Sequence, residues 1–242
     1  MTLLTICQQI FRETSNTVPS SIVGNNEENA IKMLSCAQAE GRMLAKGIIY
    51  NANGQISGQH DWTILRKEYT FNTAASTEGY SLPSDFERFI GDTWWNRTQT
   101  RRLCLVNPQR WQMLKSGLAS ATGIDQEFIK RGANILIYPT PTAIETLVYE
   151  YLSNQWCESS GGTDKSAFTA DTDNLLIDED LFTLGLKWRF LRAIGDPYAD
   201  EKLEYDSLFM SKVGNDGGRQ TVRMTGYSSG YLPNLPDTGY GS

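Results

Sequence analysis

The sequence predicts an α+β protein, in which a four-helix bundle formed by both chain ends carries an inserted β-rich domain and an extended C-terminal tail. Three observations predict this architecture. Apolar residues recur every three or four positions in residues 1–58 and 158–214, which is the period of amphipathic helices. Residues 59–157 are rich in aromatic and β-branched side chains, which suit a pleated sheet. Residues 215–242 are rich in Gly, Ser, Pro and Tyr and cannot form a core alone.

The N-terminal segment predicts two helices. Residues 2–14 form the first, with an apolar face of Leu3, Leu4, Cys7, Ile10 and Phe11. The second begins near Asn26 and ends before residues 51–58, and its apolar stripe consists of Ala30, Met33, Leu34, Ala37, Leu44 and Ile48. Small residues along this helix leave room for a neighbouring helix to approach closely, namely Ala37, Ala39, Gly41 and Ala45.

The β-rich segment predicts about six strands and one short helix. The strands are expected at residues 60–72, 89–95, 101–106, 124–129, 133–138 and 145–153. Asn107 and Pro108 are typical of the cap and first position of a helix, so a short helix is expected over 108–116.

The C-terminal part predicts an exposed loop followed by two helices. Residues 158–173 are polar and rich in Gly, Ser, Thr and Asp, which indicates the loop. A helix then begins at Asp178, with an apolar stripe of Leu181, Leu184, Trp188 and Leu191. Gly195 and Pro197 end it, and a last helix is expected over 198–213. Four helices from both chain ends can pack as one bundle, from which the β-rich domain would project.

Composition limits the possible functions. The chain has 242 residues and a formal net charge of −6, so it lacks the excess of Lys and Arg that neutralises nucleic-acid phosphates. An acidic protein can still surround DNA without binding it. No stretch approaches the roughly 20 apolar residues of a membrane helix, and the N-terminus lacks the features of a signal peptide, so no membrane association is expected.

No metal or cofactor site is expected. Cys7, Cys36, Cys104 and Cys157 form no Cys-x-x-Cys pair and lie far from the single histidine, His60. We therefore expect free, buried thiols. The sequence also contains no phosphate-binding loop.

No catalytic residue is expected either. His60 and Asp61 are adjacent on a predicted strand, so they should point to opposite faces, and a structural role for His60 is favoured. The acidic pairs 178–179 and 200–201 open helices, where capping and the helix dipole explain them without catalysis.

Aromatic and basic residues leave further alternatives open. Arg97, Arg101 and Arg102 follow Trp94 and Trp95, which fits a nucleic-acid patch but fits a charged sheet edge better. A carbohydrate-binding module using the two tryptophans, or a small hydrolase with a carboxylate site, are further alternatives. Trp188 belongs to an apolar stripe, so core packing is favoured over a ligand platform.

Three motifs in a fixed order carry a resemblance. They are YSLPSDFER at 80–88, LIYPTP at 136–141 followed by YEYLSN at 149–154, and LGLKWRFLRAIG at 184–195 followed by Tyr198. Together they resemble the head-to-tail adaptor proteins of short-tailed bacteriophages, the group that includes tail tubular protein A and the adaptor of SU10-like phages. The motif positions for which we expect a structural role are Leu82, Pro83, Asp85, Phe86, Tyr138, Pro139, Trp188, Gly195 and Tyr198.

The resemblance implies a non-enzymatic virion protein of the phage neck, assembled in the host cytoplasm. It implies about twelve copies in a ring, with the portal protein above, a tail nozzle or tail fibre protein below, and DNA passing through the centre. It also implies that the C-terminal tail binds the portal, through Tyr227, Tyr231, Leu232, Leu235 and Tyr240. Another virion tail or head-completion component is the main alternative.

Overall fold

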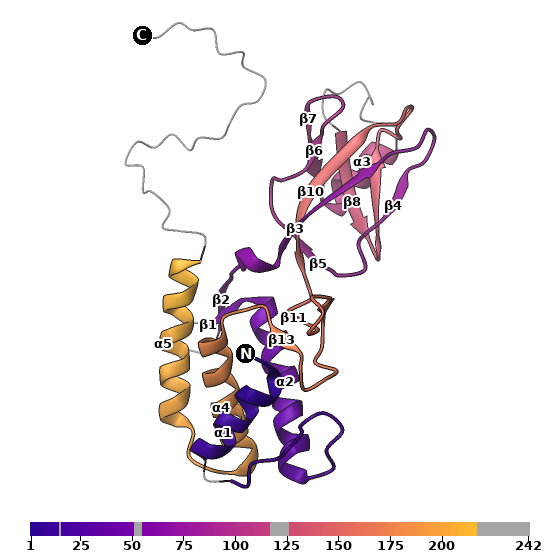
Figure 1. Cartoon of the computed structure of the whole chain (residues 1–242). Coiled ribbons are helices and arrows are strands. Elements are labelled where there is room, and N and C mark those ends of the chain that lie inside the picture. The colour runs from indigo at the N-terminus through magenta and orange to yellow at the C-terminus, as the bar shows by residue number, and fades with distance from the viewer. Residues whose placement is uncertain (15, 51–54, 117–125, 217–242) are drawn as a thin grey trace, which may run out of the picture.

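The computed structural model describes residues 1–14, 16–50, 55–116 and 126–216, which form an α+β fold with two units (Figure 1). We call them the helical unit and the β unit. The helices of the described residues are α1 (Leu3–Glu13), α2 (Glu28–Lys46), α3 (Pro108–Lys115), α4 (Glu179–Ile194) and α5 (Ala199–Asn215). All but α3 belong to the helical unit.

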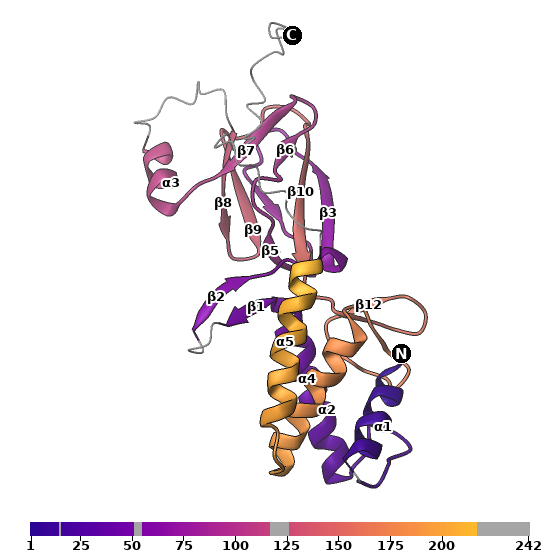
Figure 2. The same ribbon diagram turned by 90° about the vertical axis from the view of Figure 1, so that its left-hand side faces the viewer.

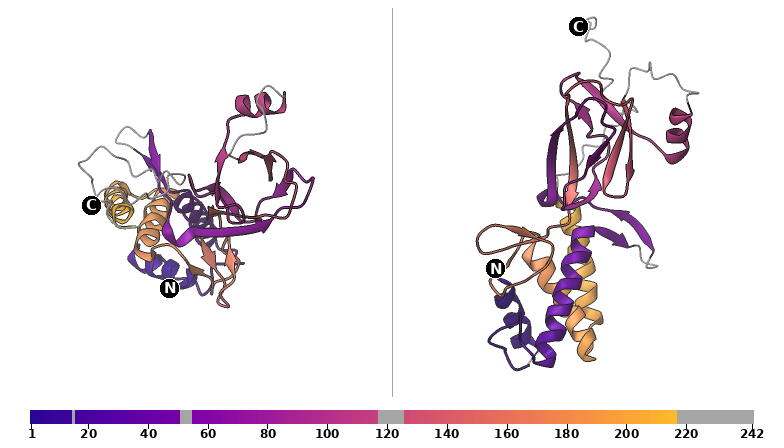
Figure 3. Two further views of the ribbon diagram at one scale, coloured as in Figure 1. Left: turned by 90° about the horizontal axis from the view of Figure 1, so that it is seen from above. Right: turned by 90° about the vertical axis from the view of Figure 1, so that its right-hand side faces the viewer.

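The β unit is built on a curled, mixed sheet (Figure 3). Its strands are β3 (Arg66–Asn72), β4 (Gly79–Ser81), β5 (Phe86–Phe89), β6 (Trp95–Asn96), β7 (Arg101–Leu105), β8 (Gln126–Arg131), β9 (Asn134–Tyr138) and β10 (Thr146–Ser153). The order is β3-β10-β6-β7-β8-β9-β4, and β5 also pairs with β10. Only β7 and β8 run parallel among these pairs.

An aromatic core fills the concave side of this sheet. Trp94 stacks on Tyr149 with ring centroids 3.9 Å apart, and the Phe128 ring packs on the same indole at a tilt, also with centroids 3.9 Å apart. The region predicted as one strand over 89–95 is instead two short strands, β5 and β6. The chain turns between them at Asp92, which has a positive φ of 59°. This turn aims Trp94 into the core.

Two small sheets lie outside the β unit. The strands β1 (Ile48–Tyr50) and β2 (Ile56–Gln59) pair antiparallel, and Figure 2 shows them projecting beside the boundary between the units. Within the helical unit, β11 (Cys157–Glu158) pairs with β12 (Asp164–Lys165) and with β13 (Asn174–Leu175). The predicted strand over 60–72 is shorter than expected: β3 begins only at Arg66, a 3₁₀ turn occupies Thr63–Leu65, and residues 60–62, which include His60 and Asp61, lie outside any strand.

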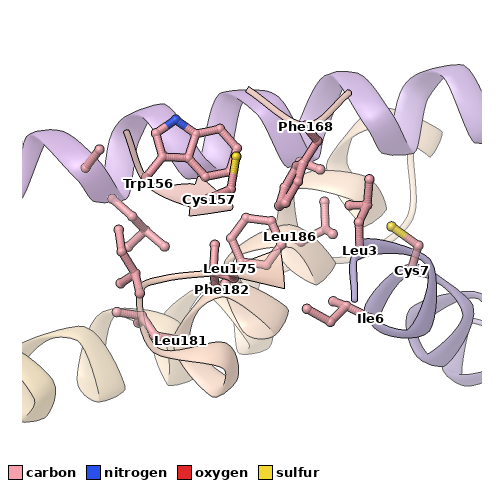
Figure 4. Packing of buried hydrophobic residues seen from close by; sticks show 14 of the residues in the cluster. Leu3, Ile6, Cys7, Trp156, Cys157, Phe168, Leu175, Leu181, Phe182 and Leu186 are labelled. Atoms are coloured by element: carbon pink, nitrogen blue, oxygen red, sulfur yellow. The ribbon is translucent and has the colours of Figure 1, made fainter. Parts of the chain in front are cut away.

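The helices of both chain ends share one core, and α4 packs against α1, α2 and α5. The amphipathic stripes predict this core well, since Leu3, Ile10, Met33 and Leu181 are all fully buried. A four-helix bundle is not confirmed, because non-helical residues occupy part of the core. Figure 4 shows Trp156, Cys157, Phe168 and Leu175 between α2 and α4.

Residues 158–173 form only in part the exposed loop that their polarity predicts: residues 160–163 are exposed, but other parts of the segment pack against the helices. Phe168 is buried, and Asp173 is only 1% exposed. The Asp173 carboxylate accepts hydrogen bonds from the Thr169 and Ala170 amides and pairs with Lys165 at 2.6 Å. The polar side chains therefore bond to the segment itself and hold it against the helices.

The close approach predicted at Gly41 is made by an indole and not by a helix. A Cβ at Gly41 would lie 2.3 Å from the Trp156 ring, so this ring packs directly on the α2 backbone. The short helix α3 agrees with its prediction: Asn107 accepts a hydrogen bond from the Arg110 amide at 2.7 Å, and Pro108 is at the first position.

Candidate interaction surfaces

A polar network around Asp85 joins the β unit to the helical unit. The Asp85 carboxylate accepts hydrogen bonds from Tyr151 at 2.9 Å, Ser153 at 2.8 Å and Lys67 at 3.0 Å. Lys67 of β3 also donates to Asp164 of β12 at 2.8 Å. Burial alone would raise the pKa of Asp85, but these hydrogen bonds outweigh burial and hold that pKa below its ordinary value.

Arg88 of β5 makes a second connection. Its guanidinium donates to Asp61 at 2.8 and 2.6 Å and to the backbone carbonyls of Lys46 and His60 at 3.0 and 2.8 Å. Lys46 is the last residue of α2, so Arg88 fixes the β unit to the end of that helix. Gly47 follows with a φ of 58°, and its backbone touches the His60 carbonyl so closely that a Cβ would lie 2.0 Å from that oxygen.

Asp216 makes a third connection, from the end of α5. It pairs with His60 Nε2 at 2.7 Å and accepts hydrogen bonds from the Thr63 amide at 2.9 Å and hydroxyl at 2.5 Å. Burial would raise the pKa of Asp216, but Thr63 and His60 lower it overall. His60 therefore has a structural partner and does not pair with Asp61, as the sequence predicts.

A buried ionic cluster links three helices inside the helical unit. Glu40 of α2 is fully buried and pairs with Arg189 of α4. Tyr205 of α5 lies on the other side of the same carboxylate, and burial together with Glu40 raises its pKa. Gly185 of α4 makes this possible, because a Cβ there would lie 2.2 Å from Glu40 Oε1 and 2.8 Å from Tyr205 Cε2.

The cluster was not predicted, although the sequence holds a signal for it. Glu40 occupies the apolar stripe of α2, between Ala37 and Leu44 at helical spacing. A charge at such a position is buried on folding and needs a partner, because an unpaired buried carboxylate is costly.

The third motif lies where α4 turns into α5. Trp188 is 6% exposed, which confirms core packing, and its ring lies 6.3 Å from that of Tyr198 and 6.2 Å from that of Tyr205. Arg189, Arg192 and Lys202 all lie over the indole face, at 4.6 to 5.7 Å from its centroid. Gly195 caps α4 with a φ of 89°.

The other motif positions lie in the β unit. Leu82 packs at the margin of the aromatic core. The Pro83 carbonyl accepts a hydrogen bond from the Phe86 amide at 3.1 Å, which closes a turn, and the Phe86 ring stacks on that of Tyr151. Tyr138 and Pro139, joined by a cis peptide bond, follow β9, where Tyr138 packs against Trp111 of α3. The motifs do not converge on one pocket.

The basic residues near the tryptophans lie at and beside one end of β7. Arg101 and Arg102 pair with Asn96 and Trp95 of β6 on one side, whereas β8 pairs only with the later residues Leu103–Leu105, so an edge position for the two arginines stays a prediction. Arg97 and Arg102 pair with Glu68 and Asp92 at 3.0 and 2.7 Å, which neutralises their charge.

The two tryptophans do not form a paired platform for a sugar. Trp94 is 3% exposed and belongs to the aromatic core. Half-buried Trp95 lines an open hollow of about 510 Å³ together with the carboxylates of Glu68, Asp92 and Glu150. A carbohydrate-binding module would have to use one indole here, and not the two that the sequence suggests.

A buried carboxylate in the β unit has a structural explanation. Glu145 is 6% exposed and accepts hydrogen bonds from Asn96 at 2.6 Å and Gln126 at 2.9 Å, as well as from Gln99. These amides come from β6, β8 and the turn after β6, so the cluster holds the sheet together at one end.

The cysteines and possible metal ligands were compared with their predictions. All four cysteines are free, Cys7 and Cys157 being buried and Cys36 and Cys104 half-buried. Among the described residues, no three or more His, Cys, Asp or Glu side chains group as a metal site would require. No helix in that part of the chain is long and apolar enough to cross a membrane.

The proposed portal-binding residues lie outside the described residues: Tyr227, Tyr231, Leu232, Leu235 and Tyr240.

A comparison with models of protein families shows to which family the chain belongs. The family model for the SU10 adaptor protein matches residues 1–230, which include both units. The chain belongs to the SU10 adaptor protein family. Members of the SU10 adaptor family are structural components of bacteriophages. No curated protein matches the chain.

Proposed function

We propose that this chain is a head-to-tail adaptor of a phage virion, which forms a ring between the portal and the tail nozzle or tail fibres. The observation that carries this proposal is the family match over residues 1–230, because it includes the helical unit, the β unit and the connections between them. In this proposal the protein is located in the virion neck and has no catalytic role.

The shape of the molecule supports a connecting role. The two units lie at opposite ends of an elongated protein (Figure 1). Arg88, Lys67 and Asp216 each make polar contacts across the boundary between them. A ring subunit with two ends in a fixed relative orientation can hold two different partners in register. We propose domain boundaries near residues 58, 157 and 214, as the sequence predicts, with the last one moved to follow Asp216 because α5 continues to Asn215.

The net charge of −6 supports passage of DNA through the ring. Like charges on the duplex and on the protein favour sliding over binding. Twelve copies is the number that the family resemblance implies, and we propose it for this chain.

Electron microscopy of the protein mixed with its portal tests the proposal. The expected result is a ring of this chain stacked coaxially on the portal ring. A complex in which the chain is found only at the distal end of the tail would favour another virion component, and no complex at all with the portal would refute the adaptor role.

We further propose that the C-terminal tail binds the portal through its tyrosines and leucines, with Tyr227 and Tyr231 as the first contacts. Truncation after Gly217 tests this proposal, because it keeps Asp216 and its bonds to His60 and Thr63. The truncated protein should keep its circular dichroism spectrum and lose portal binding. Full-affinity binding by the truncated protein would refute tail docking without affecting the adaptor role.

A further inference from the structure

The outer face of α5 is partly apolar and acidic. Leu203 and Met210, seven residues apart on the same side of the helix, are 68% and 55% exposed. Asp200 lies one turn before Leu203 on the same side of the helix, and Glu204 follows Leu203 directly; neither carboxylate has an ion-pair partner among the residues that the structure describes. Exposed Leu and Met side chains on one face of a helix can belong to a contact surface.

A second surface, between α2 and α4, is hollow and basic. Small residues of α2 leave a hollow of about 260 Å³ against α4, lined by Ser35, Cys36, Ala39, Arg189, Arg192 and Ala193. Arg192 is exposed and contacts the Trp188 ring but, within the described ranges, has no carboxylate partner. Ile31, one turn before Ser35 on α2, is 53% exposed. Arg42 and Lys46, farther along the same helix, are also exposed and have no carboxylate partner in the described part of the chain.

The two faces are complementary in shape, charge and position. Leu203 protrudes between Asp200 and Glu204, whereas the hollow has Arg192 at its margin. Leu203 is exposed on α5, whereas the hollow lies between α2 and α4, so the two surfaces are different. Both features lie near the end of the helical unit that is remote from the β unit, where α4 ends and α5 begins.

We propose that the outer face of α5 in one copy of the chain docks on the α2–α4 hollow of the next copy, with Leu203 entering the hollow and Glu204 near Arg192. The contact joins two different surfaces, so it is heterologous, and repeating it generates a closed ring or an open helix. This inference rests on the proposed adaptor function and names the surfaces that form its ring.

The native Cys36 thiol permits a direct test, because it lines the hollow. In Leu203→Cys, the new thiol should lie close to Cys36 of the neighbouring copy. Treatment of the portal-bound assembly with a short bismaleimide should then produce a ladder of covalent oligomers on a denaturing gel. The ladder should disappear in the double variant Leu203→Cys/Cys36→Ser. Ile144→Cys is the matched control, since Ile144 is 73% exposed but lies in the β unit.

The outcomes separate this inference from the adaptor role. A ladder that requires both thiols supports the α5–hollow contact. If electron microscopy shows a ring on the portal but no ladder forms with Leu203→Cys, the contact is wrong and the adaptor role stands. If the wild-type chain forms no ring with the portal, both proposals fail.

A charge exchange provides a second measurement. Glu204→Arg and Arg192→Glu should each weaken ring assembly about tenfold or more, because each places like charges in contact. The double variant should recover most of the loss, since the pair is restored in reverse. Circular dichroism confirms that each variant is folded. Equal loss in the single and double variants would overturn the proposed pairing.

Discussion

Gly185→Ala tests the buried ionic cluster of the helical unit. Gly185 lies in the interior of α4, where alanine is normally favoured over glycine by about 1 kcal/mol. In this position, however, the added Cβ would lie 2.2 Å from Glu40 Oε1 and 2.8 Å from Tyr205 Cε2. One or both side chains must therefore move, and Glu40 cannot move far without losing Arg189.

The expected cost follows from the burial of the pair. Breaking a buried ion pair costs about 3–5 kcal/mol. The side chain of Arg189 is 15% exposed and that of Glu40 is fully buried, so we expect a cost near the middle of that range. After the gain in helix propensity, Gly185→Ala should lower the free energy of unfolding by about 3 kcal/mol. For a chain of this size the Tm should fall by roughly 6–12 °C.

Urea unfolding followed by circular dichroism at 222 nm measures this change, because most of the helical signal comes from the helical unit. Gly214→Ala in α5 is the matched control: nothing lies within 4 Å of its Cβ position, so alanine should stabilise there by about 0.5–1 kcal/mol. The reasoning is refuted if Gly185→Ala stabilises the protein as much as Gly214→Ala does.

Three further predictions concern the core and the boundary between the units. Gly41→Ala should destabilise by about 2 kcal/mol in the same assay, because the Cβ would overlap the Trp156 ring; a neutral effect would contradict direct packing of that ring on α2. The pKa of Asp85 is lower in the folded protein than in the unfolded chain, so its stabilisation is present above about pH 4 and is lost as the pH falls through the folded-state pKa. In Asp85→Asn, the free energy of unfolding should therefore fall less as the pH is lowered below about 4 than it does in the wild type. An unchanged pH dependence would refute a stabilising role of the Asp85 carboxylate. Asp216→Ala should speed amide hydrogen exchange in the last turn of α5 by roughly fivefold, corresponding to about 1 kcal/mol, whereas unchanged exchange would mean that its bonds to His60 and Thr63 do not restrain the helix.

Local patterns predicted most of the helices. The stripe of α1, the Asn107 cap of α3 and the Asp178 start of α4 all depend on residues close together in the sequence, and each agrees with the structure. Apolar residues that recur every three or four positions lie on one face of a single helix. Such a helix can therefore be predicted without knowing which element packs against it.

Features that depend on distant residues were not predictable in the same way. The polarity of residues 158–173 indicates solvent exposure, but Asp173 is buried because amides of its own segment satisfy its carboxylate. The division of the region 89–95 is different, because Gly91 and Asp92 are turn residues, and the turn at Asp92 that lets Trp94 enter the core therefore had a local signal in the sequence. Arg88 and Lys67 make the boundary contacts with residues from separate segments, and no spacing in the sequence reveals those pairings.

The position of Asp216 sets a limit on where a partner of the tail can lie. Figure 1 shows α5 returning from the remote end of the helical unit towards the β unit, and Asp216 is fastened to His60 and Thr63 at the boundary between the units. The described chain thus ends beside this boundary and not at either tip of the molecule. The residues that follow, 217–242, span at most about 90 Å at full extension. Any site that they bind must lie inside that radius around Asp216, and it can belong to a protein on either side of the ring.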